Sequence, residues 1–125
     1  MKKKVISAVL ACIMLMVCVV NVYAYSDSTS IGPYGSKTSV SISWAAETVT
    51  ASNGSNSAQD DSYCKAYIYY DNGEYISNWN TSITTAISAT ATHSVYPPGA
   101  TRISTYSTYH EVEFDGTSYD HSFNK

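Results

Sequence analysis

Two histidines near the carboxyl end of the chain are spaced so that they could share a metal ion. His110 and His121 lie on either side of Asp115-Gly116. Asp-Gly between two alternating segments predicts a β-hairpin with a two-residue turn. That register places the two histidines directly opposite each other, with Cβ atoms about 4.5–5.5 Å apart. Two such imidazoles could bind Zn²⁺, or, because no third ligand is evident, they could be neutral rings that pack or form hydrogen bonds.

The other face of the same hairpin is acidic. Glu111 and Glu113 alternate along the strand with His110 and Val112, so they lie on the other face, and Asp120 is expected opposite Glu111. Like charges in directly opposite positions destabilise a sheet, and a bound Ca²⁺ would relieve the repulsion because it prefers carboxylate oxygens. The alternative is a solvated acidic face that discourages pairing with another sheet. A three-residue loop would change the register and place His110 opposite Asp120.

The same carboxylates raise the question of catalysis. Glu111 and Glu113 stand two residues apart on one strand, which approximates the separation of about 5–5.5 Å in retaining glycosidases. That chemistry needs a deep cleft, which a chain of this size rarely forms. No G-x-S-x-G elbow, phosphate-binding loop or C-x-x-C pair occurs in the sequence. The sequence therefore predicts a protein that is not an enzyme.

Aromatic residues provide a different kind of candidate site. Tyr63, Tyr67 and Tyr69 share one face of an expected strand, and Trp79 follows on the next strand. Aromatic rings bind sugars or proteins because each offers a large apolar surface at low entropic cost, together with a polar edge in Tyr and Trp. The alternative is that these residues only stabilise the sheet through cross-strand pairs.

A single cysteine, Cys64, lies on the opposite phase of that strand. A small buried hydrophobic residue is the first interpretation. An exposed thiol that links two chains is the other, because the remaining cysteines lie in the amino-terminal segment.

The amino terminus has the pattern of a secretory signal peptide. Lys2, Lys3 and Lys4 precede an apolar run from Val5 to Val20, and Val22-Tyr23-Ala24 resembles a cleavage site. We expect residues 1–24 to be removed and the product to be secreted, with no membrane segment after cleavage. An uncleaved anchor and a lipoprotein modified at Cys12 remain the alternatives. The scarcity of cysteine fits an exported bacterial protein.

The expected mature chain is acidic. All ten acidic residues, but only four of the seven basic ones, follow Ala24. The resulting net charge of about −6 argues against nucleic acid as a partner, because such partners require a basic patch.

Alternation and turn signals predict an all-β fold. Residues 25–37 are rich in Ser and Gly and suggest a flexible leader, and residues 38–125 suggest one domain. About seven short strands, with Asn-Gly and Asp-Gly hairpins and a turn at Pro97-Pro98-Gly99, indicate a single antiparallel β-sandwich. An immunoglobulin-like arrangement is the first choice, although the Cys–Trp–Cys signature is missing.

These observations favour a secreted, non-catalytic extracellular binding or surface-interaction module. Its ligand would be a glycan or a protein at a cell surface, bound by Tyr63, Tyr67, Tyr69 and Trp79. No cofactor is required, with Zn²⁺ at His110 and His121 or Ca²⁺ at the acidic residues left open. The alternative is a small secreted effector or toxin that acts on another cell. The oligomeric state stays open.

Overall fold

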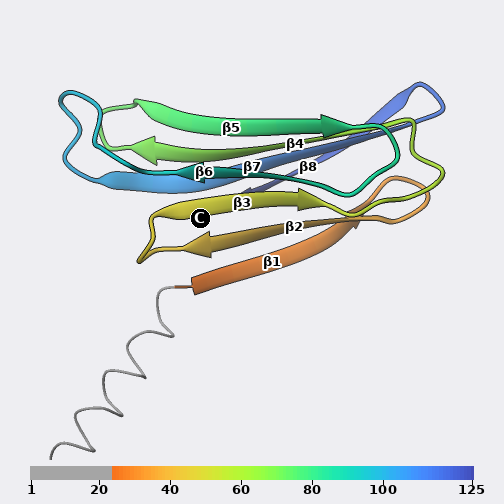
Figure 1. Cartoon of the computed structure of the whole chain (residues 1–125), viewed down its shortest axis with the longest axis horizontal. Coiled ribbons are helices and arrows are strands. Elements are labelled where there is room, and N and C mark those ends of the chain that lie inside the picture. The colour runs from red at the N-terminus through yellow and green to blue at the C-terminus, as the bar shows by residue number, and fades with distance from the viewer. Residues whose placement is uncertain (1–23) are drawn as a thin grey trace, which may run out of the picture.

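The computed structural model describes residues 24–125, and these residues form strands joined by turns and loops (Figure 1). The predicted signal peptide, except for Ala24, lies outside the described residues. The eight strands are β1 (Ala24–Ile31), β2 (Ser36–Ser43), β3 (Thr48–Asn53), β4 (Asp61–Tyr70), β5 (Tyr75–Ser82), β6 (Ile87–Thr92), β7 (Ile103–Phe114) and β8 (Thr117–Asn124).

Two antiparallel four-stranded sheets pack face to face. One has the order β1-β2-β3-β6 and the other the order β5-β4-β7-β8. In the view of Figure 1, β5 and β4 lie at the top, β3, β2 and β1 lie below, and β6 overlaps β7. The β-sandwich prediction is confirmed. In the first sheet β2 pairs with β3 and β3 with β6, and in the second sheet β4 lies between β5 and β7.

Period-two alternation explains which face of each strand is buried. Along β4 every second side chain points into the sandwich and is buried, namely Ser62, Cys64, Ala66, Ile68 and Tyr70. The last four of these side chains meet the inward-facing Val40, Ile42, Val49, Ala51, Ala89 and Ala91 of the other sheet in one core cluster. β-Branched and aromatic residues favour this pleated, half-buried environment.

The predicted flexible leader is wrong in this structure. Residues 24–31 form β1, which pairs with β2 along its whole length from Ala24 opposite Ser43 to Ile31 opposite Ser36. Gly32 and Gly35 have positive φ values of 76° and 63° and make the connecting turn possible. Polar β1 buries only Ile31 fully, so backbone hydrogen bonds hold this strand where hydrophobic burial does not.

The alternating segment from Ile83 to Val95 forms a strand over only part of its length. Only Ile87–Thr92 forms β6. Thr84 has a φ of 59°, so the chain bends there, and Ile83 is left 71% exposed. A positive φ is unusual for a β-branched residue, and nothing in the alternation of this segment signals it.

Side-chain hydrogen bonds close one side of the sandwich. The amide nitrogens of Asn78 and Asn80 in β5 donate to the backbone oxygens of Thr90 and Ser88 in β6, at 2.9 and 3.2 Å. These bonds join the edge strands of the two sheets.

One end of the sandwich is fixed by a polar chain. The buried Tyr70 hydroxyl lies 2.7 Å from Nδ1 of His93, and Nε2 of His93 lies 3.3 Å from a carboxylate oxygen of Glu47. Because Tyr70 is only 2% exposed, its hydroxyl joins the sheets and is not open to a substrate.

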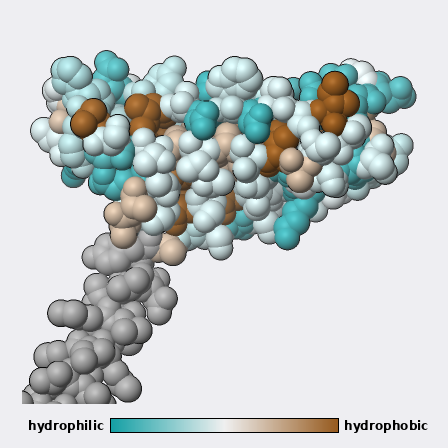
Figure 2. Space-filling model, in the orientation of Figure 1, coloured by the Kyte–Doolittle hydropathy of each residue, from teal (hydrophilic) through white to brown (hydrophobic). Residues whose placement is uncertain are grey.

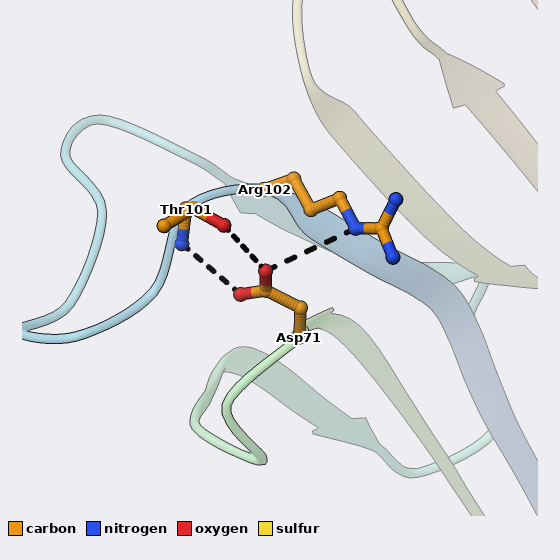
Figure 3. Close-up of polar contacts among 3 residues, drawn as sticks. All are labelled: Asp71, Thr101 and Arg102. Atoms are coloured by element: carbon orange, nitrogen blue, oxygen red, sulfur yellow. Dashed lines mark hydrogen bonds and ion pairs between the residues drawn. The ribbon is translucent and has the colours of Figure 1, made fainter.

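The same end carries a second polar contact, drawn in Figure 3. The Asp71 carboxylate accepts hydrogen bonds from the backbone nitrogen and the hydroxyl of Thr101, at 3.0 and 2.6 Å. These bonds, the hydroxyl bond first, lower the pKa of Asp71. They tie the β4–β5 hairpin to the segment that leads into β7.

Between Ala24 and Lys125 the structure contains no helix that is long and apolar enough to cross a membrane.

Candidate functional site

The outward surface of the β5-β4-β7-β8 sheet carries all four aromatic residues that the sequence predicts to bind a ligand. Tyr63, Tyr67 and Tyr69 of β4 are half-buried, and Trp79 of β5 is 60% exposed. The structure therefore brings the four residues onto one surface. It also adds Tyr75 and Tyr109 to them, and we call the six residues together the aromatic face.

Three tyrosines form one group on this face. The rings of Tyr67 and Tyr69 are stacked, with centroids 5.5 Å apart and an interplanar angle of 18°. The ring of Tyr75 lies 6.0 Å from that of Tyr67 and 5.7 Å from that of Tyr69. We call these three residues the tyrosine group.

A second group surrounds the tryptophan. The ring of Tyr63 stacks on Trp79 at 6.3 Å and contacts the ring of Tyr109 at 6.0 Å. Tyr63 thus connects an aromatic residue of β5 with one of β7. We call Tyr63, Trp79 and Tyr109 the tryptophan group.

Lys65 stands between the two groups. It pairs across the strands with Trp79 on one side and Tyr109 on the other. Its ammonium nitrogen lies over the ring of Tyr67, 4.7 Å from the centroid. A cation in this position is attracted by the negative face of the ring, and a hydrogen bond with Tyr67 raises the pKa of Lys65.

Local turn chemistry explains how Tyr75 joins the face. The β4–β5 hairpin turns through Asp71-Asn72-Gly73, and Gly73 supplies the positive φ of 87°. Tyr75 then lies directly opposite Tyr69. The Asn-Gly signal in the sequence could have revealed this residue, whereas Tyr109 depends on the pairing of β4 with β7, which the sequence does not encode locally.

The carboxylates predicted to face each other do so. Glu111 pairs with Asp120, as the two-residue turn predicts, and Asp115 and Gly116 have φ values of 51° and 74°. Asp61 of β4 lies opposite Glu113, which adds a second like-charged pair. We call Asp61, Glu111, Glu113 and Asp120 the acidic end of the sheet.

The acidic end adjoins the tryptophan group. Tyr63 pairs directly with Glu111, and the Tyr109 hydroxyl donates a 2.6 Å hydrogen bond to the Glu111 carboxylate. Burial first, and then this hydrogen bond, raise the pKa of Tyr109. Tyr109 is therefore a neutral hydrogen-bond donor at any physiological pH.

The two histidines face each other as predicted, but both ring nitrogens of His110 already contact other side chains. His110 lies opposite His121 and is fully buried. Its Nδ1 lies 2.7 Å from Oδ1 of Asn53, and its Nε2 lies 2.9 Å from the hydroxyl of Thr108. Because both ring nitrogens are engaged, neither is free for Zn²⁺. Burial lowers the pKa of His110 to about 4, so the ring is neutral at pH 7.

No metal geometry emerges from the described part of the chain. Within residues 24–125, no three or more His, Cys, Asp or Glu side chains are grouped so that they could hold a metal ion. The carboxylates predicted to bind Ca²⁺ are neighbours across strands, but they do not converge on one point.

Cys64 is buried in the core, as its strand phase predicts. Its thiol contacts the backbone oxygen of Ala51 at 3.7 Å. Burial raises the pKa of this thiol to about 11, which removes the thiolate needed for reactivity. A disulfide to another chain through Cys64 would require the core to open.

The opposite surface of the sandwich is built from hydroxyl side chains. In-register rows cross the β1-β2-β3-β6 sheet and consist of Ser26, Ser41, Thr50 and Thr90, followed by Ser28, Ser39, Ser52 and Ser88. We call these rows the hydroxyl face. Lys37 separates two open hollows on this side, of about 440 and 420 Å³. Figure 2, which draws one side of the whole molecule, shows a mainly pale surface with separate hydrophobic patches.

Comparison of this chain with protein-family models, with curated proteins and with solved structures finds no match.

Proposed function

We propose that this protein is a secreted, non-catalytic module that binds a glycan through its aromatic face. Six aromatic side chains on neighbouring strands carry the proposal, because they form two contacting groups on one outward surface. Export rests on the predicted signal peptide of residues 1–24.

Sugar binding agrees with the chemistry of this face. Aromatic rings provide apolar surfaces for the C–H faces of pyranose rings, and few rotatable bonds are frozen on binding. Small polar residues lie between the rings, because Ser77 and Ser107 flank Tyr67 on the two neighbouring strands. Their hydroxyl groups can exchange hydrogen bonds with sugar hydroxyls.

The face is also held in position before any ligand arrives. The ring of Tyr67 contacts both Tyr69 and Tyr75, and Tyr63 contacts both Trp79 and Tyr109. A surface whose rotamers are fixed loses less entropy on binding than a mobile one.

A screen of soluble and insoluble microbial and plant polysaccharides tests the proposal. We expect the purified protein to bind at least one of them, and Trp79→Ala and Tyr67→Ala each to weaken that binding about tenfold, the equivalent of about 1.4 kcal/mol. Ile83→Ala, at a site 71% exposed and outside the face, serves as the matched control. Circular dichroism should show all variants folded.

Either of two results would contradict this assignment. One is that no polysaccharide binds. The other is that the two face variants bind as well as the Ile83→Ala control.

A further inference from the structure

The acidic end of the sheet, Asp61, Glu111, Glu113 and Asp120, has no cationic partner within residues 24–125. Arg102 lies 3.9 Å from Asp71. Lys65 and Lys125 stand over tyrosine rings, and Lys37 lies on the hydroxyl face. The four basic residues after Ala24 are therefore all engaged or located elsewhere, and none forms an ion pair with the acidic end.

The arrangement of these carboxylates has a cost. Glu111 faces Asp120, and Asp61 faces Glu113, directly across neighbouring strands. Like charges in such positions destabilise an antiparallel sheet. A positively charged ligand group would remove this repulsion in both pairs.

The protein itself shows how its tyrosine rings receive an ammonium group. The Lys65 nitrogen lies 4.7 Å from the centroid of Tyr67, and the Lys125 nitrogen lies 4.5 Å from that of Tyr25. Trp attracts cations more strongly than Tyr does. Trp79 is 60% exposed and carries no cation from the described chain.

Charge therefore divides the face into two parts. The ammonium of Lys65 lies over the tyrosine group and repels a second cation there. On the other side, Tyr63 stacks on Trp79 and pairs with Glu111. Cation affinity is thus concentrated where the tryptophan group meets the acidic end.

We propose that the ligand of this face is a glycan with free amino groups, an amino-sugar polymer. Its apolar sugar faces lie on the tyrosine group, and its ammonium groups lie at Trp79 and Tyr63, beside Glu111 and Asp120. An ammonium group suits these carboxylates because, unlike a metal ion, it does not need several oxygens to converge on it. This inference rests on the proposed function and names the charge of its ligand.

Oligomers that differ in N-acetylation, and therefore in charge, test the inference. Chitosan oligomers carry free amino groups, and the N-acetylated oligomers of the same length are neutral. Calorimetry at low salt should show that the protein binds the chitosan oligomer at least tenfold more tightly. The difference should shrink as salt screens the charges.

Substitutions locate the effect on the face. Asp120→Asn and Glu111→Gln should each weaken chitosan binding about threefold and leave binding of the neutral oligomer unchanged. Trp79→Ala should weaken both. Asp27→Asn removes an exposed carboxylate from β1, in the other sheet, and should change neither.

The outcomes separate this inference from the proposed function. Equal binding of both oligomers, with no effect of Asp120→Asn, would overturn the amino-sugar assignment and leave glycan binding in place. If neither oligomer nor any other polysaccharide binds, both proposals are wrong. Polylysine that binds tightly while chitosan does not would assign the face to a cationic protein segment and overturn the inference.

Discussion

The two sheets expose different surfaces to solvent, although their inward faces share one core. The β5-β4-β7-β8 sheet presents the aromatic face and the acidic end. The β1-β2-β3-β6 sheet presents rows of serine and threonine, and Thr50 and Thr90 bond to each other there through hydroxyls 2.8 Å apart. In both sheets, period-two alternation places every second side chain of a strand on the outer face.

The difference shows that sheet stability alone does not dictate the outward residues. Serine and threonine are sufficient to form a stable outer face on one sheet. The other sheet uses large rings and opposed carboxylates, which add exposed apolar surface and charge repulsion. This restriction of rings and opposed carboxylates to one sheet is the observation on which the proposed ligand-binding role depends.

Acid should have the largest effect on the free energy of unfolding. Because the group responsible lies in the core between the two sheets, the effect does not distinguish the two outer faces. His110 lies in the shared interior with a pKa of about 4, below its ordinary value of 6.5. In the interval between these values the unfolded chain binds a proton that the folded chain does not. The contribution of neutral His110 to stability is therefore complete above about pH 6.5 and falls by about 3 kcal/mol as the pH is lowered to 4. Urea unfolding at several pH values measures this decrease.

A His110→Gln variant provides the comparison for that prediction. Its stability should be lower at pH 7 but should change less between pH 6.5 and 5. Equal pH slopes for the two proteins would show that His110 is not the group responsible.

Removal of the tyrosine stack should have the next largest effect. We expect the double change Tyr67→Ser and Tyr69→Ser to lower the free energy of unfolding by about 1–2 kcal/mol, because a contacting aromatic pair contributes about 0.5–1.5 kcal/mol beyond its area. Glycan binding should be lost at the same time. Unchanged binding in the folded variant would show that the tyrosine group does not bind the glycan.

The matched change on the hydroxyl face should be smaller. Thr50→Val together with Thr90→Val removes both partners of one exposed hydrogen bond and should change the unfolding free energy by less than about 0.5 kcal/mol. Glycan binding should stay the same. A large loss of binding in this variant would place the ligand on the hydroxyl face and contradict the assignment of binding to the aromatic face.

The smallest effect should have opposite signs for stability and binding. Asp120→Asn removes one of two like charges and should raise the unfolding free energy by a few tenths of a kcal/mol. Binding of a cationic glycan should weaken. Destabilisation by this change, measured at low salt, would mean that Asp120 makes a favourable contact and not a repulsive one.

Local signals in the sequence predicted part of this architecture. Asp115-Gly116 predicted a two-residue turn, with a three-residue loop as the alternative, and the structure has the register of the two-residue turn, with His110 opposite His121 and Glu111 opposite Asp120. Alternation along β4 predicted that Cys64 is buried. In each case the deciding information lay within a few residues.

Features that depend on distant segments were not predictable in this way. The partner of His110 is Asn53, a residue 57 positions away. Tyr109 joins the aromatic face only because β7 pairs with β4. The sequence predicts a leader where the structure has β1. This strand pairs with β2 through backbone groups, and the pattern of side chains along the sequence carries no information about such groups.

The hydrogen bonds that the side-chain amides of Asn78 and Asn80 donate to β6 have a consequence for aggregation. An unpaired strand edge is a template on which a fibril can grow, because its backbone groups accept the next chain. In β6 the carbonyl oxygens of Thr90 and Ser88 already receive side-chain donors. A foreign strand could add there only after both amides had rotated away, so this side of the molecule resists self-templated growth.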